Sequence, residues 1–398
     1  MISLTGKKIV LGVTGSIAAY KSAELVRQLK KAGAVVEVVM TANATRFVAP
    51  LTFETLSGNR VIWDMFSQYG TSIDHISLGQ DSDLILIAPA TANFLAKIAH
   101  GLGDDFISTL ILAATAKILI CPAMDKEMFS NSIVQANIRS LKERGFIVIE
   151  PARGLLATGS VGLGRFPDPS IILEEVGRLL TDHDLEGLRV LVTAGPTIEY
   201  IDPVRIVTNR STGKMGYAMA RAAWRRGAEV TLVTGPTHLE PPQGIQMIKV
   251  KTAEEMREAV LHNYKDKDVV IKAAAVGDYR PLRKAREKEK KKRDPIVLEM
   301  IPTPDILAEL GTDKGHISLV GFAAETTHHI ANAKDKIKEK NLDLIVVNDV
   351  SREDRGFAAD SNEVTMIDRK GNEETVPLMP KEEVADRILD KIKGLRAA

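Results

Sequence analysis

The stretch "KIVLGVTGS", residues 8–16, decides the fold class of this chain. Its apolar run has the length of a buried strand, and its end is rich in glycine and serine. A helical pattern, "AAYKSAELVRQLKKAG", follows almost at once over residues 18–33. A strand, a glycine-rich turn and a helix in this order predict one unit of an α/β fold with a parallel sheet.

The same alternation continues along the chain. Further strand-like runs cover residues 34–41, 83–91, 117–124 and 146–152, with helical patterns between them. The periodicity breaks over residues 179–189, and new strand-like runs then cover residues 189–197, 228–237, 268–276, 316–325 and 342–349. We therefore predict two α/β domains, residues 1–184 and 185–398, without an internal repeat of fixed period.

Composition narrows the class of protein. The 398 residues are 44% hydrophobic and 26% charged, with a formal net charge of +1, so nothing global favours nucleic acid or an anionic membrane as a partner. The N-terminal apolar run is too short to span a membrane and is not followed by a signal-peptide cleavage site. A single cysteine excludes an internal disulfide and a multi-cysteine metal site. We expect a cytoplasmic protein, since this cysteine usage fits a reducing compartment.

Two turns at strand ends predict a ligand site in the first domain. Gly12, Gly15 and Ser16 lie where the first strand passes into its helix, and amides at a helix N-terminus bind phosphate. A second polar turn, residues 90–93, follows a later strand, and ligands of open parallel sheets bind at such ends. The spacing is not GxGxxG, so a dinucleotide site is not predicted. Two such turns suit one phosphate and one flat ring, as in a mononucleotide flavin.

The second domain carries a more specific segment, "TAGPTIEYIDPVRIVTNRSTGKMG", residues 193–216. A strand in the core would not tolerate so many polar groups without partners. The polar side chains of this segment suit the binding of phosphoryl or carboxylate groups; they are Arg205, Asn209, Ser211 and Lys214.

Other polar residues of this domain allow two interpretations each. Asp278 can bind a base or a cation, or simply cap a helix. Lys336 and Lys340 lie four apart on one helix face, either solvated or neutralising a triphosphate. The basic run at residues 283–293 is either a solvated loop or a flap over a polyphosphate.

Taken together, these motifs resemble the bifunctional coenzyme A biosynthesis proteins, and the resemblance covers almost the whole chain. It is carried by "GVTGSIAAYK", "DHI", "PAMDKEMF", the segment at 193–216, "AAAVGDYRP", "TPDIL", "VGFAAET" and "KNLDLIVVND". That family joins a phosphopantothenoylcysteine decarboxylase to a phosphopantothenate–cysteine ligase. The resemblance implies an N-terminal flavodoxin-like domain of the HFCD flavoprotein type, which binds FMN. It also implies a C-terminal Rossmann-like ligase domain, which uses CTP and Mg²⁺.

The resemblance also implies the ligase residues. Asn209 matches the residue that handles the acyl-cytidylate intermediate, and Lys288 matches the first lysine of a Lys-x-Lys-Lys motif, read here as "KEKK" with Glu289 inside it. The implied CTP contacts are Ala273, Ala274, Asp278, Lys288, Pro304, Asp305, Ile306, Leu307, Phe322, Lys336 and Lys340. The resemblance identifies no metal ligands.

The decarboxylase half departs from the family pattern at two positions. The implied FMN contacts are Gly15, Ser16, Thr41, Ala90, Thr91 and Asn93, and His75 matches the active-site histidine. However, Asp125 stands where the family has an asparagine that holds the substrate carboxylate, and Thr158 stands in place of the catalytic cysteine. A second carboxylate would repel the substrate unless one of the two is protonated, and a threonine is a much weaker acid than a thiol.

Cys121 lies just before Pro122, away from the position of the family's proton donor. We predict a buried structural thiol, since free cysteine behaves in cores as a small hydrophobe.

Two interpretations of the first domain follow. Asp125 and Thr158 form a working variant, with Asp125 protonated in a dry pocket and another donor replacing the thiol. Alternatively, the flavin domain is inactive, stalls at the enethiol or serves as a regulatory binding module. We predict the bifunctional enzyme, with Asp125 and Thr158 among its catalytic residues. Its partners are then small-molecule substrates, and the family implies a homo-oligomer, either a dodecamer or a trimer and dimer assembly.

Overall fold

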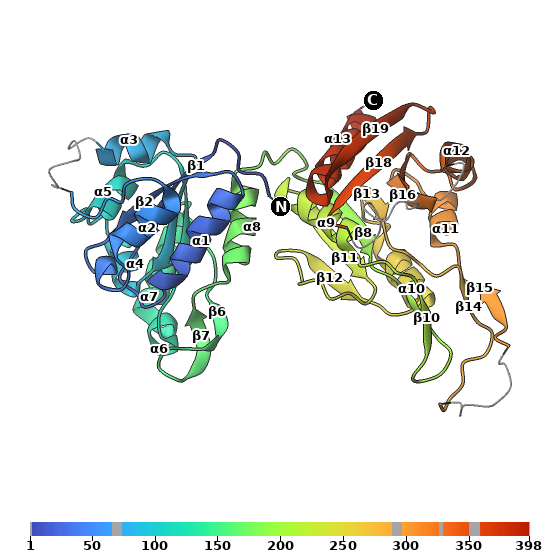
Figure 1. The fold of residues 1–398 in the computed structure, drawn as a ribbon, viewed down its shortest axis with the longest axis horizontal. Coiled ribbons are helices and arrows are strands. Elements are labelled where there is room, and N and C mark those ends of the chain that lie inside the picture. Colours follow the sequence, from blue (N-terminus) through green and yellow to red (C-terminus); the bar gives the residue numbers. More distant parts are fainter. Residues whose placement is uncertain (1, 66–73, 289–296, 326–328, 350–358, 398) are drawn as a thin grey trace. The chain divides into compact units, whose positions relative to one another are not determined.

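The computed structural model describes residues 2–65, 74–288, 297–325, 329–349 and 359–397. The chain forms two compact units, residues 1–181 and 182–398 (Figure 1). Each unit is built on a sheet with helices on its two faces, so the predicted α/β class is confirmed. The boundary after residue 184 stays a prediction of where the two activities divide.

The first unit alternates strands and helices as its sequence pattern predicts. Its elements are β1 (Lys8–Val13), α1 (Ala19–Lys31), β2 (Val35–Met40), η1 (Ala44–Arg46), α2 (Pro50–Ser57), α3 (Asp74–Asp81), β3 (Leu84–Ala90), α4 (Ala92–Ala99), α5 (Phe106–Ala113), β4 (Lys117–Pro122), α6 (Lys126–Ser130), α7 (Ser132–Glu143), β5 (Ile147–Val148), β6 (Ala152–Leu155), β7 (Val161–Arg165) and α8 (Pro169–Leu179).

The main sheet of this unit is parallel, in the order β2-β1-β3-β4-β5. Its strands are buried on both faces because side chains alternate along each strand. In β1, Ile9 and Leu11 pack toward α1, α2 and α8, whereas Val10 packs toward α4, α5 and α7. The order places the carboxyl ends of β1, β2, β3 and β4 along one edge. The antiparallel pair β6 and β7 follows as a separate hairpin.

Cys121 lies on β4 and is fully buried in the core on the α1 face. Burial, and then the nearby charge of Glu175, raise the pKa of its thiol, so the reactive thiolate is not formed near neutral pH. The predicted burial of this thiol is confirmed, and its purely structural role stays a prediction.

The second unit has a longer, mixed sheet. Its elements are β8 (Arg189–Ala194), β9 (Ile198–Tyr200), β10 (Ile206–Thr208), α9 (Lys214–Arg225), β11 (Glu229–Thr234), β12 (Gln246–Lys249), α10 (Ala253–Asn263), β13 (Val269–Lys272), β14 (Tyr279–Pro281), β15 (Met300–Pro302), α11 (Ile306–Thr312), β16 (Ser318–Glu325), α12 (His329–Glu339), β17 (Leu344–Asp349), β18 (Ser361–Asp368), β19 (Glu373–Pro380) and α13 (Lys381–Ala397).

The strand order in this sheet is β12-β11-β8-β13-β16-β17-β18-β19. The strands from β12 to β17 run parallel, and β18 and β19 are antiparallel additions at one side. Helices α9 and α13 cover one face, where Tyr217 and Ile388 join the core. Helices α10, α11 and α12 cover the other, where Met256 and Ile337 do so. In the described part of the chain, no helix is long and apolar enough to cross a membrane.

Candidate functional site

Thr14 ties together two of the turns at the carboxyl edge of the first sheet. Its hydroxyl donates to the carbonyl of Pro89 over 2.8 Å and accepts from the amide of Thr91 over 3.0 Å. The turn after β1, with Gly15 and Ser16, therefore lies beside the turn after β3, with Ala90 and Thr91. This is the arrangement that the sequence predicts.

The turn after β2 lies directly against the turn after β1, because Gly15 allows a close approach to Asn43. A Cβ atom at Gly15 would lie 2.6 Å from the Cβ of Asn43, so glycine is required for the two turns to meet. Ser16 Oγ accepts from the amide of Ala18 over 3.2 Å, and α1 has no side-chain cap at its N-cap residue. The start of α1 thus keeps the partial positive charge with which helix N-termini bind anions.

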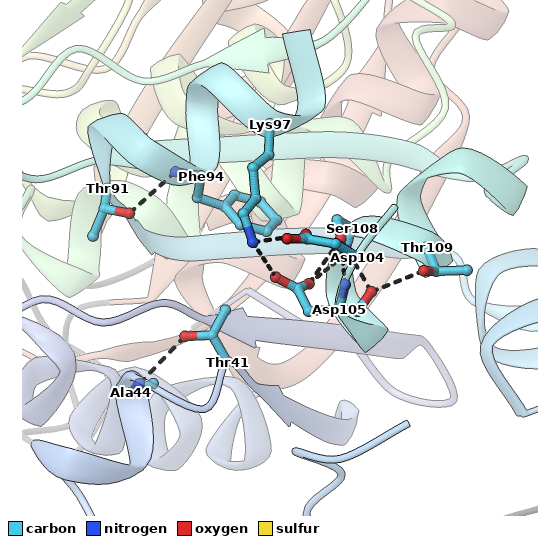
Figure 2. A network of polar contacts seen from close by, with 9 residues as sticks. All are labelled: Thr41, Ala44, Thr91, Phe94, Lys97, Asp104, Asp105, Ser108 and Thr109. Atoms are coloured by element: carbon cyan, nitrogen blue, oxygen red, sulfur yellow. Dashed lines mark hydrogen bonds and ion pairs between the residues drawn. The ribbon is translucent and has the colours of Figure 1, made fainter. Parts of the chain in front are cut away.

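Thr41 and Thr91, both predicted FMN contacts, use their hydroxyl oxygens to order the turns (Figure 2). Thr41 Oγ1 accepts from the amide of Ala44, and Thr91 Oγ1 accepts from the amide of Phe94, each over 3.3 Å. A hydroxyl that accepts a backbone bond keeps its own proton to donate. Both side chains can therefore donate to a phosphate or a ring carbonyl. Asn93, the remaining predicted contact, is exposed in the first turn of α4.

An ionic cluster fixes the loop between α4 and α5. Lys97 Nζ lies 2.7 Å from Asp104 Oδ1 and 3.0 Å from Asp105 Oδ2, as Figure 2 shows. Asp105 also caps α5 in a reciprocal pair with Ser108. The next residue, Phe106, packs edge-on against the ring of His75, with 6.1 Å between the ring centroids. The position of His75 therefore depends on the start of α5. The described contacts of His75 do not reach the strand-end turns.

Asp125 and Thr158 lie side by side in the first unit. Thr158, in the loop between β6 and β7, donates to Asp125 Oδ2 over 2.8 Å, and it also lies 3.0 Å from Ser160 Oγ. Asp125 is the N-cap of α6 and accepts from the amide of Glu127 over 3.0 Å.

The environment of Asp125 favours its charged form. The bond from the Glu127 amide, and then the bond from Thr158, lower the pKa of this carboxyl, which is not enclosed in a dry pocket. The hypothesis of a protonated Asp125 requires the opposite shift, and it stays a prediction about the site with its ligands bound.

The turn after β4 is held against β7. The amide of Met124 donates to the carbonyl of Gly164 over 3.0 Å. A Cβ atom at Gly164 would lie 2.2 Å from the carbonyl oxygen of Met124, and the φ of Gly164 is +141°. Glycine is therefore needed here for both space and conformation, and it sets the approach of Asp125 to the β6–β7 hairpin.

The second unit holds a cavity of about 960 Å³ beyond the carboxyl ends of β13 and β17. The predicted ligase residues gather there: the cavity is lined by Asn209, Ala273, Ala274, Asp278, Pro304, Asp305, Ile306, Leu307, Phe322, Lys336 and Lys340. These residues come from five separate stretches of sequence. The fold therefore brings residues that are distant in sequence together in one cavity.

Backbone and threonine bonds hold the loops after β8 and β13 together. The Thr193 hydroxyl accepts from the amide of Ala274 over 3.1 Å, and the Thr197 hydroxyl accepts from the amide of Gly277 over 2.9 Å. Asn209 spans the same loops, since its side-chain amide donates to the carbonyls of Ala275 and Val276 over 3.1 and 3.2 Å. The side-chain oxygen of Asn209 is thereby the group that it can offer to a ligand.

Near the start of α11, an acidic and a basic side chain that line the cavity form an ion pair. Lys340 Nζ lies 2.7 Å from Asp305 Oδ2, and Asp305 caps α11 by accepting from the amide of Ala308. Burial raises the pKa of Asp305, but its bonds to Lys340 and Ala308 outweigh that effect, and the net shift lowers the pKa. Asp305 is therefore ionised at neutral pH and holds Lys340 at the cavity.

Two residues from the sequence analysis do not line the cavity. Arg205 pairs with Asp202, which is fully buried and also accepts from the amides of Val204 and Arg205, so this pair shapes the loop before β10. Lys288 is exposed at the edge of a described segment, and residues 289–291 of its motif lie outside the described residues. The role of Lys288 stays a prediction.

Sequence reasoning missed several residues of the cavity. Lys272 lines it from the last position of β13, and Asn348, Asn362 and Lys381 line it from β17, β18 and the start of α13. The side-chain oxygens of Asn348 and Asn362 are buried and have no hydrogen-bond partner among the described residues. The available signal was a lysine inside the apolar run "DVVIKAAAV", directly before a predicted contact.

Comparison with protein families defines the class of protein. Residues 2–181 match the family model described as Flavoprotein, and residues 185–395 match the model described as DNA/pantothenate metabolism flavoprotein C-terminal domain. The chain thus combines a flavoprotein domain with a domain of pantothenate metabolism.

Full-length relatives identify the family. The chain is 46% identical over 397 residues to the Coenzyme A biosynthesis bifunctional protein CoaBC of Bacillus subtilis, covering 98% of each chain. It is 43% identical over 396 residues to the protein of that name from Vibrio cholerae, covering 98% of this chain and 99% of that one. A solved structure titled as the C-terminal domain of such a protein is 45% identical, with a TM-score of 0.47, and covers 54% of this chain and 98% of its own. The chain belongs to the family of bifunctional coenzyme A biosynthesis proteins.

Proposed function

We propose that this protein catalyses two steps of coenzyme A biosynthesis. The domain at residues 185–398 joins cysteine to 4'-phosphopantothenate with CTP, and the domain at residues 1–184 then decarboxylates 4'-phosphopantothenoylcysteine to 4'-phosphopantetheine with FMN. The names of the relatives, which state coenzyme A biosynthesis and two functions, support both steps. The observation that carries the proposal is the convergence of the predicted CTP residues in one cavity.

The cavity has the groups that nucleotidyl transfer needs. In the first half-reaction, the carboxylate of 4'-phosphopantothenate attacks the α-phosphorus of CTP and diphosphate leaves. In the second, the amine of cysteine attacks the acyl carbon and CMP leaves. Lys336 and Lys340 supply positive charge beside the phosphates, which stabilises the charge that builds up in transfer. Asn209, held by two carbonyls, presents a fixed side-chain oxygen to the acyl intermediate.

The turns of the first sheet fit a flavin mononucleotide. The uncapped start of α1 and the hydroxyls of Ser16, Thr41 and Thr91 suit the phosphate and the polar ring edge. When bound, FMN supplies the oxidation of the substrate thiol that makes loss of carbon dioxide possible. Asp125 follows β4, the strand beside β3, and Thr158 contacts it from the β6–β7 hairpin, where the pair would act on the substrate rather than on the cofactor.

Mg²⁺ belongs to the proposal as a partner of CTP. No group of three or more His, Cys, Asp and Glu side chains that could hold a metal ion occurs within the described ranges. Magnesium in nucleotide sites is commonly bound through substrate phosphates, one or two carboxylates and water. We therefore expect Mg²⁺ to enter with the nucleotide.

We also propose a cytoplasmic homo-oligomer, assembled as trimers and dimers up to a dodecamer. Exposed apolar side chains near the carboxyl edge of the first sheet, Ile17, Tyr20, Phe47 and Leu51, support a subunit contact there. The decarboxylase site is then completed across subunits. Light scattering together with activity tests this point: an obligate monomer with full decarboxylase activity would contradict it.

The experiment that tests the function is an incubation of the purified protein with 4'-phosphopantothenate, CTP, Mg²⁺ and cysteine, followed by mass analysis. Phosphopantetheine as product shows both activities. Accumulation of phosphopantothenoylcysteine or its enethiol shows an active ligase with an inactive or stalled flavin domain, and Thr158→Cys is then the variant to test. Absence of CMP and diphosphate contradicts the proposed ligase.

A further inference from the structure

Lys272 lines the cavity of the second unit, and the proposed function does not use it. Side chains alternate along β13: Val269 and Ile271 pack in the core with α9 and α13, whereas Val270 packs in the core with α10, α11 and α12. Lys272 is two residues beyond Val270 and so faces the α11 and α12 side. It lines the cavity there and is partly buried.

Among the described residues, the carboxylate that acts most strongly on Lys272 is that of Asp305, which Lys340 shares. Its register neighbours on β8 and β16 are Thr193 and Gly321, which carry no charge. Asp305 at the start of α11 acts on it, but the carboxylate of Asp305 is already 2.7 Å from Lys340 Nζ. Asp278 acts on it more weakly than Lys340, and Lys336 of α12 adds a further positive charge to the cavity.

Resting on the proposed function, we propose that Lys272 is a further contact for the nucleotide phosphates, and that its ammonium group gains its proton when the phosphates enter the cavity. An anion of several charges beside this amine offsets the burial that disfavours its charged form. The ligand is thus a polyphosphate that neutralises the cavity, and protons enter with it.

The protonation state of Lys272 without ligand agrees with this. Burial lowers the pKa of Lys272 to about 8. The charge of Asp305 raises this pKa by more than the charge of Lys340 lowers it, and Asp278 adds a smaller raising effect, but these charges offset only part of the effect of burial. A group with a pKa about 8 is roughly half neutral at pH 8 and almost fully charged at pH 6.5. Phosphate charge raises the pKa again, so binding takes up protons at pH 8 and hardly any at pH 6.5.

The test is calorimetric titration of the full-length protein with CTP and Mg²⁺, without phosphopantothenate and cysteine. Titrations in two buffers of different ionisation enthalpy give the number of protons taken up at pH 8 and at pH 6.5. We expect Lys272 to account for a fraction of a proton at about pH 8 and for almost none at about pH 6.5. Lys272→Met should lose this share and weaken CTP binding about tenfold or more, because a contact between charged groups is lost.

Two further variants separate charge from position. Lys272→Arg stays charged at every pH, so it should retain CTP binding without the linked proton uptake. Lys338→Met removes an exposed lysine of α12 that does not line the cavity, and it should match the original protein in affinity and proton count. Lys381, which also lines the cavity and whose pKa burial also lowers to about 8, is tested in parallel as Lys381→Met.

The outcomes are distinct. Proton uptake that Lys272→Met reduces and Lys338→Met leaves unchanged supports the inference. Equal affinity and proton count in Lys272→Met and the original protein overturns it, as does uptake that disappears only in Lys381→Met. If Lys272→Met does not fold, the pH dependence of the original protein and of Lys272→Arg decides the question. A protein that does not bind CTP at all overturns the proposed function, and the inference with it.

Discussion

The Thr158 hydroxyl donates a hydrogen bond to the carboxylate of Asp125 over 2.8 Å, so the two residues that depart from the family pattern contact each other. The two positions are 33 residues apart in sequence and come from the β6–β7 loop and the start of α6. Because the threonine proton is engaged by a charged acceptor, Thr158 is poorly suited to replace a thiol as proton donor. The pair instead places a stabilised negative charge at the start of α6, in the turn that follows β4.

This relationship predicts the effect of Thr158→Val. The Glu127 amide and the Thr158 hydroxyl both lower the pKa of Asp125, so loss of the hydroxyl should raise that pKa toward its ordinary value. Carboxyl-carbon NMR of Asp125 across acidic pH measures the shift directly. Ser160→Ala is the control, since Ser160 contacts Thr158 but has no described bond to Asp125. An unchanged titration of Asp125 in Thr158→Val would show that the hydrogen bond is not formed in solution.

Gly164→Ala should disrupt the support of Asp125. The new Cβ would lie 2.2 Å from the Met124 carbonyl oxygen at a φ of +141°, so we expect a loss of about 3 kcal/mol or more in the free energy of unfolding of the first unit. Gly159→Ala is a matched control, because its φ is +81° but nothing lies within 4 Å of the new Cβ. That control should cost only about 1–2 kcal/mol.

Amide exchange followed by mass spectrometry localises this effect. Gly164→Ala should speed exchange in residues 122–126 and 161–165, where the Met124 amide bonds to Gly164. Gly159→Ala should leave these segments protected. Similar exchange in both variants would contradict the role given to Gly164.

Cys121→Ala should leave both activities intact. The thiol is fully buried in the core, and burial raises its pKa, so it has neither the access nor the charge of a nucleophile. We expect a small loss of stability, about 1–2 kcal/mol, from the smaller side chain. In the original protein, a thiol reagent should react only after unfolding. Rapid labelling of native protein, or loss of decarboxylation in Cys121→Ala, would contradict a purely structural role.

Glu382→Gln should weaken the packing of α13 on α9. Glu382 Oε1 lies 2.6 Å from Arg221 and its Oε2 lies 2.8 Å from Arg225. Burial raises the pKa of Glu382, but the two arginines outweigh burial and the net shift lowers it. The stabilisation is therefore present above the unfolded pKa of about 4.3 and is lost as pH falls through the lower folded value.

At pH 7 the variant should lose about 3 kcal/mol of unfolding free energy, and the difference from the original protein should shrink toward pH 3. Urea unfolding of both proteins at a series of pH values measures this. Glu383→Gln changes the exposed neighbour and is the control. A difference that is constant with pH would rule out the ion pair as its cause.

The strands and the strand-end turns of both units could be predicted from sequence, because the alternation of apolar runs and helical patterns determines a parallel sheet and its carboxyl edge. The placement of Gly15, Thr91 and Asp278 in strand-end turns is predictable for this reason. Three other features depend on long-range geometry. Asn362 and Lys381 line the cavity only because β18 pairs antiparallel with β17. No local sequence pattern predicts that pairing. Arg205 has the chemistry of a phosphate contact, but a buried Asp202 binds it.

Lys272 was missed for a different reason. A single lysine at the end of an apolar strand is usually a solvated strand end, and only the packing of α11 and α12 over that face turns it into a cavity residue. The hydrogen bond between Asp125 and Thr158 could not be predicted either, since the two residues are 33 positions apart and meet only because the β6–β7 hairpin lies against the start of α6.

Because the chain divides into two units after Thr181, the residues of the two sites are synthesised at different times. Every predicted flavin contact, as well as Asp125 and Thr158, belongs to residues that leave the ribosome before β8 is made. The first sheet can therefore close while translation continues, since domains generally fold as units from the N-terminus. The cavity of the second unit draws on residues from Asn209 to Lys381 and is complete only once nearly all of its unit has emerged. A translating ribosome would thus carry a finished flavin domain before any nucleotide cavity exists.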